Sequence, residues 1–359
     1  MRILVTGGLG FIGSHVVQAA LAQDHEVRVL DIRSVDQAAA APDCSVLNEI
    51  FGKVGKVGSG PVEVLQGDVR SAEAVGGAVV GVDAVIHLAA KVGLGDGVSD
   101  AADYVSVNNV GTAVLISELA NADIDRLVVA SSMVVYGEGL GTCIDHGAVA
   151  PRARTEQRLA AGDFEALCPN CPEPLTPLLI DESAPLAPAN VYATSKLAQE
   201  HLSANWARVV GGTATALRYH NVYGRRLPRD TPYAGVAALF VSMLRRGESP
   251  RVFEDGQQRR DFVHVRDVAR ATVAALQGDE PGACRAFNVG SGTPRTVGQM
   301  AQELAHATGG LAPTVTGQFR IGDVRHITAS SQRAADQLRW SASESFAGGM
   351  AELALVDGR

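Results

Sequence analysis

The sequence has no apolar run near the roughly 20 residues that a membrane-spanning helix needs. Its first residues, MRILVTGG, turn glycine-rich too early for a signal peptide, which requires a longer apolar region and a cleavage site. Positive charge is also in deficit, with 31 Lys and Arg against 39 Asp and Glu, and this balance disfavours nucleic acid as the main partner. We therefore expect a cytoplasmic protein with neither a membrane nor a nucleic-acid partner.

Cysteine is scarce, with five residues, and an odd number in a long chain does not favour a disulfide framework. Three of the five lie in one segment that also contains a histidine, as Cys143-x2-His146 and Cys168-x2-Cys171. Two short-spaced pairs of thiol and imidazole ligands are typical of a structural zinc site. Incidental cysteines or one disulfide remain the alternatives, and a water or carboxylate could replace His146.

The apolar segments that are present alternate between two periods. Short apolar runs are followed by stretches with helical spacing, such as FIGSHVVQAALAQ, and this alternation predicts an α/β fold with a doubly wound parallel sheet. The expected strands cover residues 2–8, 25–32, 62–69, 83–90, 125–137 and 213–224.

The predicted domain organisation follows from the point at which the alternation of strand and helix patterns ends. Residues 138–185 are rich in Pro, Gly, Arg and Cys and show little periodicity, so we interpret them as an insertion that carries the predicted zinc site. We expect residues 1–220 to form the dinucleotide-binding domain, with residues 262–290 partly returning to it. Residues 221–359 are expected to form a smaller α+β lobe that binds substrate.

A glycine-rich turn follows the first expected strand. TGGLGFIG places Gly7, Gly10 and Gly13 between a strand and a helix, where they allow a tight turn and close approach of a pyrophosphate to the helix N-terminus. Asp31 ends the second expected strand, where a carboxylate can bind a ribose 2′-OH. It would repel a 2′-phosphate, which favours NAD over NADP, although Arg33 lies nearby.

A second pattern, YATSK, places Tyr192 and Lys196 four residues apart in a segment with helical spacing. Their side chains would share one helix face. An ammonium near a phenol favours the phenolate and lowers its pKa, so the pair could act as a general base near neutral pH.

These motifs together resemble the extended short-chain dehydrogenases/reductases of the nucleotide-sugar epimerase/dehydratase group. The resemblance runs over most of the chain, through TGGLGFIG, GDV, HLAA, NNVGT, SSMVVYG, YATSK, RYHNVYG, RRDFVHVRDV, FNVGSG and RIGDVRH. It implies Ser132 as the hydroxyl that hydrogen-bonds the reacting sugar oxygen, Tyr192 as the base and Lys196 as its electrostatic partner, which also holds the nicotinamide ribose.

The same resemblance implies the remaining contacts. The expected cofactor-binding residues are Gly7, Gly10, Phe11, Ile12, Gly13, Asp31, Asp68, Val69, Leu88, Ala89, Ala90, Asn108, Ser131, Tyr192, Lys196, Tyr219 and Val222. The expected substrate-binding residues are Ser132, Met133, Asn221, Tyr233, Val252, Arg260, Arg320 and Asp323, among which the two arginines would clamp the diphosphate.

The reaction type depends on the two residues after the serine. The sugar 4,6-dehydratases of this group carry an Asp-Glu pair there, because elimination and re-protonation need acids, whereas this sequence has Met133 and Val134. We therefore predict an NAD-dependent epimerase acting at C4 through a transient 4-keto sugar. A reductase of nucleotide 4-keto sugars and a non-catalytic dinucleotide sensor remain alternatives.

The substrate is expected to be a dTDP- or UDP-hexose. Family members with a CPxC insertion and a TPYAGVAA-like stretch resemble dTDP-sugar 4-epimerases, which implies a 6-deoxyhexose such as dTDP-L-rhamnose. The helices expected at residues 104–120 and 192–207 correspond to those that pair in the group's dimers, so a homodimer is expected.

Overall fold

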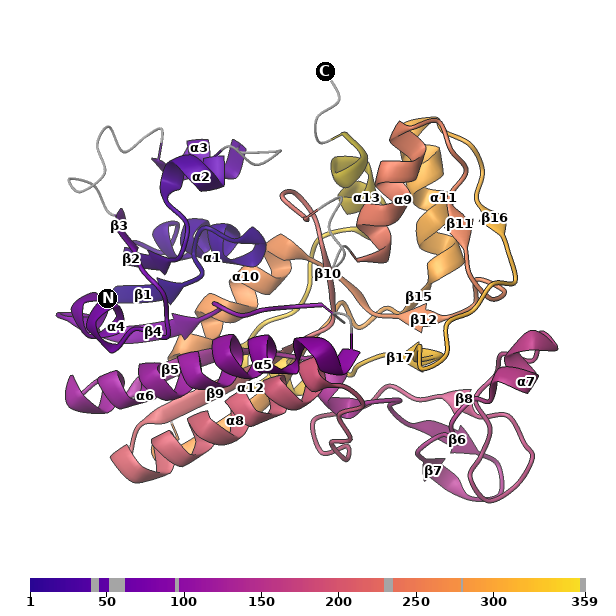
Figure 1. Ribbon diagram of the computed structural model, residues 1–359, viewed down its shortest axis with the longest axis horizontal. Helices are drawn as coiled ribbons and strands as arrows, with labels where there is room; N and C mark the ends of the chain where they lie inside the picture. Colours follow the sequence, from indigo (N-terminus) through magenta and orange to yellow (C-terminus); the bar gives the residue numbers. More distant parts are fainter. Residues whose placement is uncertain (40–44, 52–61, 94–96, 229–234, 279, 356–359) are drawn as a thin grey trace.

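The computed structural model describes residues 1–39, 45–51, 62–93, 97–228, 235–278 and 280–355. Its centre is a seven-stranded parallel sheet in the order β14-β9-β5-β4-β1-β2-β3 (Figure 1). The strands are β1 (Arg2–Thr6), β2 (Glu26–Asp31), β3 (Val62–Gln66), β4 (Ala84–His87), β5 (Arg126–Ser132), β9 (Thr213–Tyr219) and β14 (Ala283–Val289). The predicted α/β class and doubly wound parallel sheet are confirmed.

Helices cover both faces of this sheet, because its strands are apolar on both sides. One face carries α1 (Phe11–Leu21), α10 (Val265–Ala274) and α12 (Gln332–Leu338), with the 3₁₀ turn η4 (Ala275–Gln277) after α10 and with α2 (Val35–Ala39) and α3 (Ser45–Phe51) beyond α1. The other face carries α4 (Ala72–Val79), α6 (Gly111–Asn121) and α8 (Val191–Val210). A 3₁₀ turn η1 (Gly97–Asp100), α5 (Ala101–Tyr104) and a π-helical turn η2 (Val105–Val110) lead into α6.

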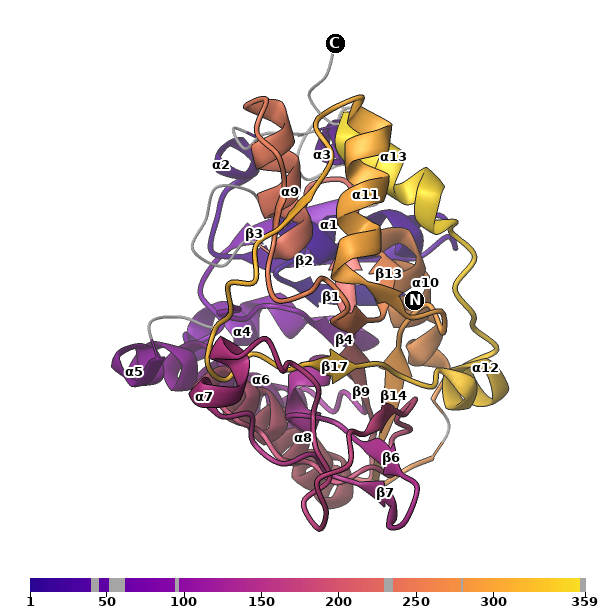
Figure 2. The same cartoon turned by 90° about the vertical axis from the view of Figure 1, so that its right-hand side faces the viewer.

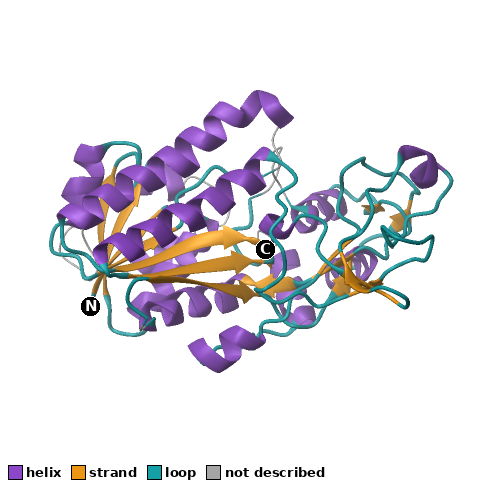
Figure 3. Ribbon diagram, turned by 90° about the horizontal axis from the view of Figure 1, so that it is seen from below, coloured by secondary structure: helices purple, strands orange, loops and turns teal. Residues whose placement is uncertain are grey.

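A second lobe lies beyond the carboxyl ends of the long strands, as Figure 3 shows. Its apolar core lies among α9 (Val236–Arg245), α11 (Val297–Thr308) and α13 (Phe346–Leu355). The short strands pair as β10 (Asn221–Tyr223) with β13 (Phe262–His264) and β11 (Arg251–Val252) with β16 (Thr314–Val315). In a third small sheet, β12 (Arg259–Arg260) lies between β15 (Arg295–Thr296) and β17 (His326–Ile327) and pairs with both. β14 is part of the central sheet and α10 packs against α1, although both come after the first residues of the second lobe in the sequence. We refer to the central sheet with its two layers of helices as the sheet half. The division of the chain at residue 220 remains a prediction.

The insertion of residues 138–185 forms a small three-stranded sheet and one short helix. It contains β6 (Gly141–Cys143), β7 (Gly147–Val149), α7 (Glu156–Ala160) and β8 (Thr176–Pro177). In Figures 1 and 2, β17 lies between these elements and the helices of the second lobe. One apolar cluster of the insertion gathers around Cys143, Cys168 and Leu175, so cysteine forms a large part of this small cluster.

All six expected strands are shorter than predicted, and the two largest differences lie at the site described below, in β5 and β9. β5 stops at Ser132, whose hydroxyl accepts a hydrogen bond from the backbone N–H of Val134 and starts the 3₁₀ turn η3 (Met133–Tyr136). The strand expected over 213–224 breaks at His220, after which β10 pairs with the second lobe instead of the main sheet. None of the helices in the described part of the chain is both long and apolar enough to cross a membrane.

Candidate active site

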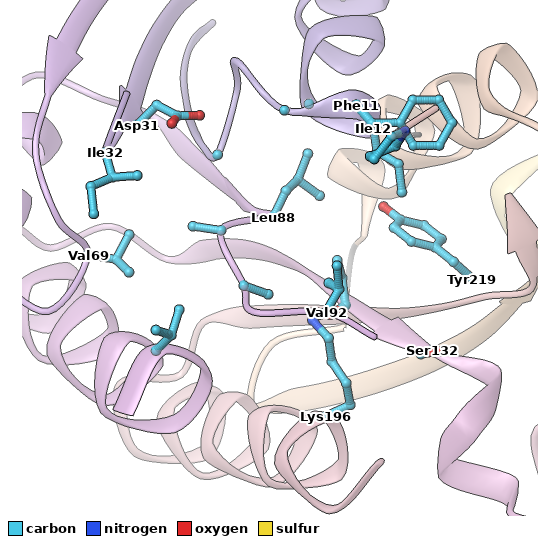
Figure 4. A pocket seen from close by; sticks show the side chains of 18 of the residues that line it. Phe11, Ile12, Asp31, Ile32, Val69, Leu88, Val92, Ser132, Lys196 and Tyr219 are labelled. Carbon is cyan, nitrogen blue, oxygen red and sulfur yellow. Dashed lines mark hydrogen bonds between the residues drawn. The ribbon is translucent and has the colours of Figure 1, made fainter. Parts of the chain in front are cut away.

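A cavity of about 630 Å³ opens along the carboxyl ends of β1, β2, β4, β5 and β9. Figure 4 shows Asp31 and Val69 toward one end and Ser132 and Lys196 toward the other. The position matches the crevice where doubly wound folds bind dinucleotides. Every residue expected to bind cofactor except Asn108 lines it, namely Gly7, Gly10, Phe11, Ile12, Gly13, Asp31, Asp68, Val69, Leu88, Ala89, Ala90, Ser131, Tyr192, Lys196, Tyr219 and Val222.

The glycine turn leaves no space for side chains. Gly7 has a φ of +72°, and a Cβ added to it would lie 2.8 Å from the backbone nitrogen of Ala89. A Cβ on Gly13 would lie only 2.1 Å from the carbonyl oxygen of Gly7. Gly10 caps α1 without a side-chain hydrogen bond, so no side chain covers the first N–H groups of this helix. Such a bare helix N-terminus fits a pyrophosphate.

Asp31 is buried and held in place by the chain itself. Its carboxylate accepts hydrogen bonds from the backbone N–H of Leu9 at 3.0 Å and of Arg33 at 3.0 Å. The Arg33 side chain lies 3.5 Å from the same carboxylate. The carboxylate therefore ties the glycine turn to the end of β2 and remains in the cavity wall, where a ribose diol would bind.

At the same end of the cavity, Asp68 forms a bidentate ion pair with Arg70. The hydrogen bonds from Arg70 lower the pKa of the Asp68 carboxyl. Arg70 also lines the cavity, although it is not among the residues predicted from the sequence. The only indication in the sequence is that Arg70 follows Asp68 of the GDV motif by two residues.

Asn108 lies outside the cavity and is fully buried in the π-helical turn η2. Its side-chain amide donates to the carbonyl of Lys91 and the hydroxyl of Ser195, and its oxygen accepts from the N–H of Lys91. These bonds fix the segment after β4 to helix α8. Residues 88–90, at the start of this segment, line the cavity. Asn108, which is expected to bind the cofactor, therefore acts on the cavity only indirectly, by holding this segment in place.

Ser132, Tyr192 and Lys196 meet because β5 ends beside the first turns of α8. Lys196 Nζ donates a hydrogen bond of 2.9 Å to the carbonyl of Ala130 on β5. The side chain of Ser132 lies within hydrogen-bonding range of the Tyr192 phenol. The Tyr192 ring also contacts that of Tyr104, with centroids 5.8 Å apart.

The expected lowering of the Tyr192 pKa by Lys196 is not found in the protein itself. Burial raises the pKa of the phenol to about 12, and the hydrogen bond with Ser132 only partly opposes it. Burial also lowers the pKa of Lys196 to about 7, against the opposing effect of Glu200. The lysine can lower the pKa of the phenol only in its protonated form, and desolvation reduces the protonated fraction of Lys196 near neutral pH.

Three residues expected at the substrate lie in the second lobe, outside the cavity: Asp323 and the two arginines expected at the diphosphate, Arg260 and Arg320. Burial raises the pKa of the Asp323 carboxyl, while Arg320 and Arg260 lie close enough to oppose that shift. The Arg260 guanidinium donates to the backbone carbonyls of residues 324–325, which fixes its position. The exposed Arg320 guanidinium lies 5.3 Å from the centroid of the Phe253 ring.

The other residues expected at the substrate differ in how well they are placed. The side-chain oxygen of Asn221 is buried and has no hydrogen-bond partner among the described residues, which suits a ligand contact. Met133 is half-buried at the start of η3. Val252 is fully buried in the core of the second lobe, so only its backbone could reach a ligand. Tyr233 lies outside the described residues.

The four predicted metal ligands converge within the insertion. Their ligand atoms all lie within 4.8 Å of one another. Cys143 Sγ lies 3.4 Å from His146 Nδ1 and 3.6 Å from Cys171 Sγ, and Cys168 Sγ lies 3.5 Å from the same imidazole nitrogen. A tetrahedral zinc site with Zn–S bonds of about 2.3 Å has S···S edges of about 3.8 Å. The sulfurs are too far apart for a disulfide, whose bond is about 2.05 Å long.

Comparison with known proteins identifies relatives of this architecture. The model of the NAD dependent epimerase/dehydratase family matches residues 3–156 and 166–290. The dTDP-L-rhamnose 4-epimerase of Burkholderia thailandensis is 33% identical over 358 residues, which cover 98% of this chain and 93% of that protein.

Solved structures of 4-epimerases share the fold over nearly the whole chain. The UDP-glucose 4-epimerase of Thermotoga maritima with UDP-glucose is 27% identical, with a TM-score of 0.76 over 99% of this chain and 97% of that one. The UDP-glucose-4-epimerase of Stenotrophomonas maltophila, with bound NAD and formylated UDP-arabinopyranose, is 25% identical, with a TM-score of 0.77 and the same coverage.

Proposed function

The chain belongs to the NAD-dependent epimerase/dehydratase family and is an NAD-dependent nucleotide-sugar epimerase, and we propose that it inverts C4 of a dTDP-6-deoxyhexose. The observation that carries this proposal is the set of Ser132, Tyr192 and Lys196 at one end of the cavity, with no acid at the two following positions, Met133 and Val134. The relative that is 33% identical is a dTDP-L-rhamnose 4-epimerase, which supports dTDP-L-rhamnose or its C4 epimer as the substrate.

In this proposal the three side chains handle the proton of the sugar C4 hydroxyl. Tyr192 Oη accepts that proton and returns it to the new hydroxyl, while the Ser132 hydroxyl orients the sugar oxygen. Bound NAD⁺ would supply a hydride acceptor and a positive charge near the phenol. The buried Lys196, fixed on the carbonyl of Ala130, adds charge in its protonated form and holds the ribose.

The absence of acids beside Ser132 limits the reaction. Loss of the C6 hydroxyl, as in a 4,6-dehydratase, needs an acid and a base close to C5 and C6. Met133 and Val134 can neither donate nor accept a proton, so we expect no 4-keto-6-deoxy product from a nucleotide hexose that carries a C6 hydroxyl.

The insertion is proposed to hold one structural zinc ion through Cys143, His146, Cys168 and Cys171. The distances between these ligand atoms fit a tetrahedron, and four protein ligands leave no open position for catalysis. Reduced thiols of this kind agree with the proposed cytoplasmic location. Elemental analysis of untagged protein should give about one zinc per chain; metal-free protein with a folded insertion would refute the assignment.

A homodimer is also proposed, through the helix that runs from α5 to α6 and through α8. Val105 and Val110 on this helix are about half exposed, at 47% and 46%. Pairing of two copies would cover them. Light scattering that gives the mass of a monomer at micromolar concentration would refute this assembly.

The activity can be tested by NMR of a panel of dTDP- and UDP-sugars incubated with catalytic NAD. The proposal predicts that dTDP-L-rhamnose and its C4 epimer reach the same equilibrium from either side without consumption of NADH. Stoichiometric oxidation of NADH with a 4-keto sugar, without interconversion of the 4-hydroxy epimers, would instead identify a reductase.

A further inference from the structure

A segment that carries two of the residues expected at the substrate lies between the insertion and the second lobe. This crossing segment, residues 320–329, includes Arg320, Asp323 and strand β17. β17 pairs with β12, so that Arg260 lies opposite Ile327. Figures 1 and 2 both show β17 between α7 of the insertion and α11 of the second lobe.

One tie between the insertion and this segment is Glu165. Its carboxylate accepts hydrogen bonds from Arg325, at 2.6 Å, and from His326 Nε2, at 3.0 Å. His326 Nδ1 accepts from the backbone N–H of Arg259, which leaves Nε2 to carry the proton toward Glu165. The hydrogen bond from His326, together with Arg325, lowers the pKa of Glu165 to about 2 despite partial burial, so Glu165 is charged at neutral pH.

The Arg325 side chain is 1% exposed and joins three carboxylates. Besides Glu165 it pairs with Glu254 at 2.8 Å and with Asp255 at 2.8 Å, both in the second lobe. The backbone carbonyl of Arg325 accepts a hydrogen bond of 3.0 Å from Arg260. The same residue therefore connects the insertion, the second lobe and the guanidinium expected at the diphosphate.

A second tie is Arg154, whose side chain is 5% exposed. Its guanidinium pairs with Glu254 at 2.8 Å and also donates to the carbonyl of Phe164, within the insertion, and to the carbonyl of Asp323. Arg154 and Glu165 are in the insertion, whereas Asp323 and Glu254 are outside it. Both ties thus end on residues next to the expected diphosphate contacts.

The cysteine cluster is directly connected to Glu165. Residues 166–168 pair with residues 173–175 through hydrogen bonds from Leu175 N to Ala166 O, at 2.8 Å, and from Cys168 N to Glu173 O, at 2.9 Å. Glu165 precedes this pair and lies three residues before Cys168. A metal ion held by Cys168 and its neighbours would fix the start of this hairpin and with it the position of Glu165.

From these contacts we infer that the insertion is a positioning element for the nucleotide part of the substrate, acting through Glu165 and Arg154 on Arg260 and Asp323. The inference rests on the proposed function, because it assumes a nucleotide sugar as the substrate. Arg260 and Asp323 would bind nucleotide, whereas Glu165 and Arg154 would act only through them. The insertion therefore affects the affinity for nucleotide and leaves the NAD cavity unchanged, because none of its described residues lines that cavity.

Glu165→Gln is the sharpest variant to test this, because Glu165 is 41% exposed on its side chain and Arg325 keeps its two other carboxylates. Glu173→Gln is its matched control: it makes the same chemical change in the same insertion, and the Glu173 side chain is exposed with no ion pair among the described residues. Calorimetric titration with dTDP and with UDP, titration with NAD, steady-state kinetics and zinc analysis would be measured on each protein.

We expect Glu165→Gln to weaken dTDP or UDP binding and raise KM for the nucleotide sugar by about tenfold, since small displacements of binding groups have effects of this order or larger. The turnover number, NAD affinity and zinc content should stay within about twofold of the native values, a factor worth only about 0.4 kcal/mol. Glu173→Gln should match the native protein throughout. Chelation of the metal should reproduce the loss of nucleotide affinity in the native protein without loss of NAD binding.

Three results would overturn the inference, and each can be distinguished from the others. If the native protein binds dTDP or UDP and Glu165→Gln binds it equally well, the insertion does not position the nucleotide and the proposed function stands. If the native protein binds neither nucleotide, both the proposed function and this inference fail. A fall in turnover number with unchanged KM would also contradict the inference, because the effect would then lie in the chemistry at Tyr192.

Discussion

The sheet half of the molecule and the insertion are stabilised by different means. The sheet half buries continuous apolar strands between two layers of helices, with side chains such as Val5, Val128 and Leu217 fully excluded from solvent. In the insertion the described apolar clusters are small: one consists of Cys143, Cys168 and Leu175, and ion pairs to the second lobe supplement it. The expected cofactor site therefore lies on a large apolar core, whereas the insertion is proposed to depend on its Cys/His cluster and on its neighbours.

The largest effect that tests this contrast is expected from removal of the metal. Structural zinc contributes about 10–16 kcal/mol of apparent binding free energy in small zinc domains, so chelation should unfold the insertion. Proteolysis should then cleave between residues 143 and 171, while NAD titration of the same sample changes by less than about twofold. Loss of NAD binding together with the insertion would show that the two regions are not separable.

Within the sheet half, Tyr192→Phe should have the next largest effect. It removes the proton acceptor, and loss of a general base typically lowers the rate by about 10²–10⁴. Kinetics should show this loss in turnover number with unchanged zinc content and thermal stability. Tyr104→Phe is the matched control, because it removes a hydroxyl from the neighbouring ring, which instead donates to the carbonyl of Gly93. A similar loss in both variants would assign the effect to packing.

A smaller effect is expected at the other end of the cavity. Asp31→Asn removes the charge that would bind the ribose diol and repel a 2′-phosphate, so NAD affinity should fall by about tenfold, or 1.4 kcal/mol, with a smaller loss for NADP. Asp36→Asn, on the exposed face of α2, should leave both affinities unchanged. Native protein that binds NADP as tightly as NAD would contradict the role of Asp31.

The smallest effect concerns Lys196, whose burial lowers its pKa from 10.5 to about 7. Between these two values the unfolded chain binds a proton that the folded protein releases, so this group makes the folded protein more stable as pH rises from about 7 to 10.5. Lys196→Met should remove that dependence and, at pH 7, raise the free energy of unfolding on the order of 1 kcal/mol while it lowers activity. Chemical denaturation of the native protein and the variant at pH 7 and pH 10 measures the free energy of unfolding and its pH dependence. A native protein whose free energy of unfolding falls over this range in the same way as that of the variant would contradict the assignment.

Local sequence patterns were sufficient to predict the cofactor end of the site. Gly7, Gly10 and Gly13 follow one strand directly, and Asp31 ends the next strand, so their positions depend on the sheet alone. Ser132 and Tyr192 could be brought together only with the family resemblance, because nearly 60 residues separate them. Once that fold is assumed, the end of β5 and the start of α8 are neighbours.

Sequence patterns could not predict the contacts of the insertion or the pKa values at the active site. The ties from Arg154 to Glu254 and from Glu165 to Arg325 join residues 100 and 160 positions apart, with no periodic pattern to indicate them. The shifted pKa values of Tyr192 and Lys196 depend on how completely the surrounding elements exclude water, which spacing along one helix does not reveal.

The central claim is that the hydrogen at C4 of the sugar leaves and returns within one active site. The most direct measurement is a crossover experiment with two populations of dTDP-L-rhamnose in equal amounts. One population carries deuterium both at C4 and on the nucleotide, and the other carries no label. The C4 epimer that forms is then analysed by mass spectrometry. The account predicts that each product molecule keeps its own C4 hydrogen isotope, without exchange with solvent or with added NADH. Product that carries deuterium from the other substrate population, from labelled NADH or from the solvent would contradict it.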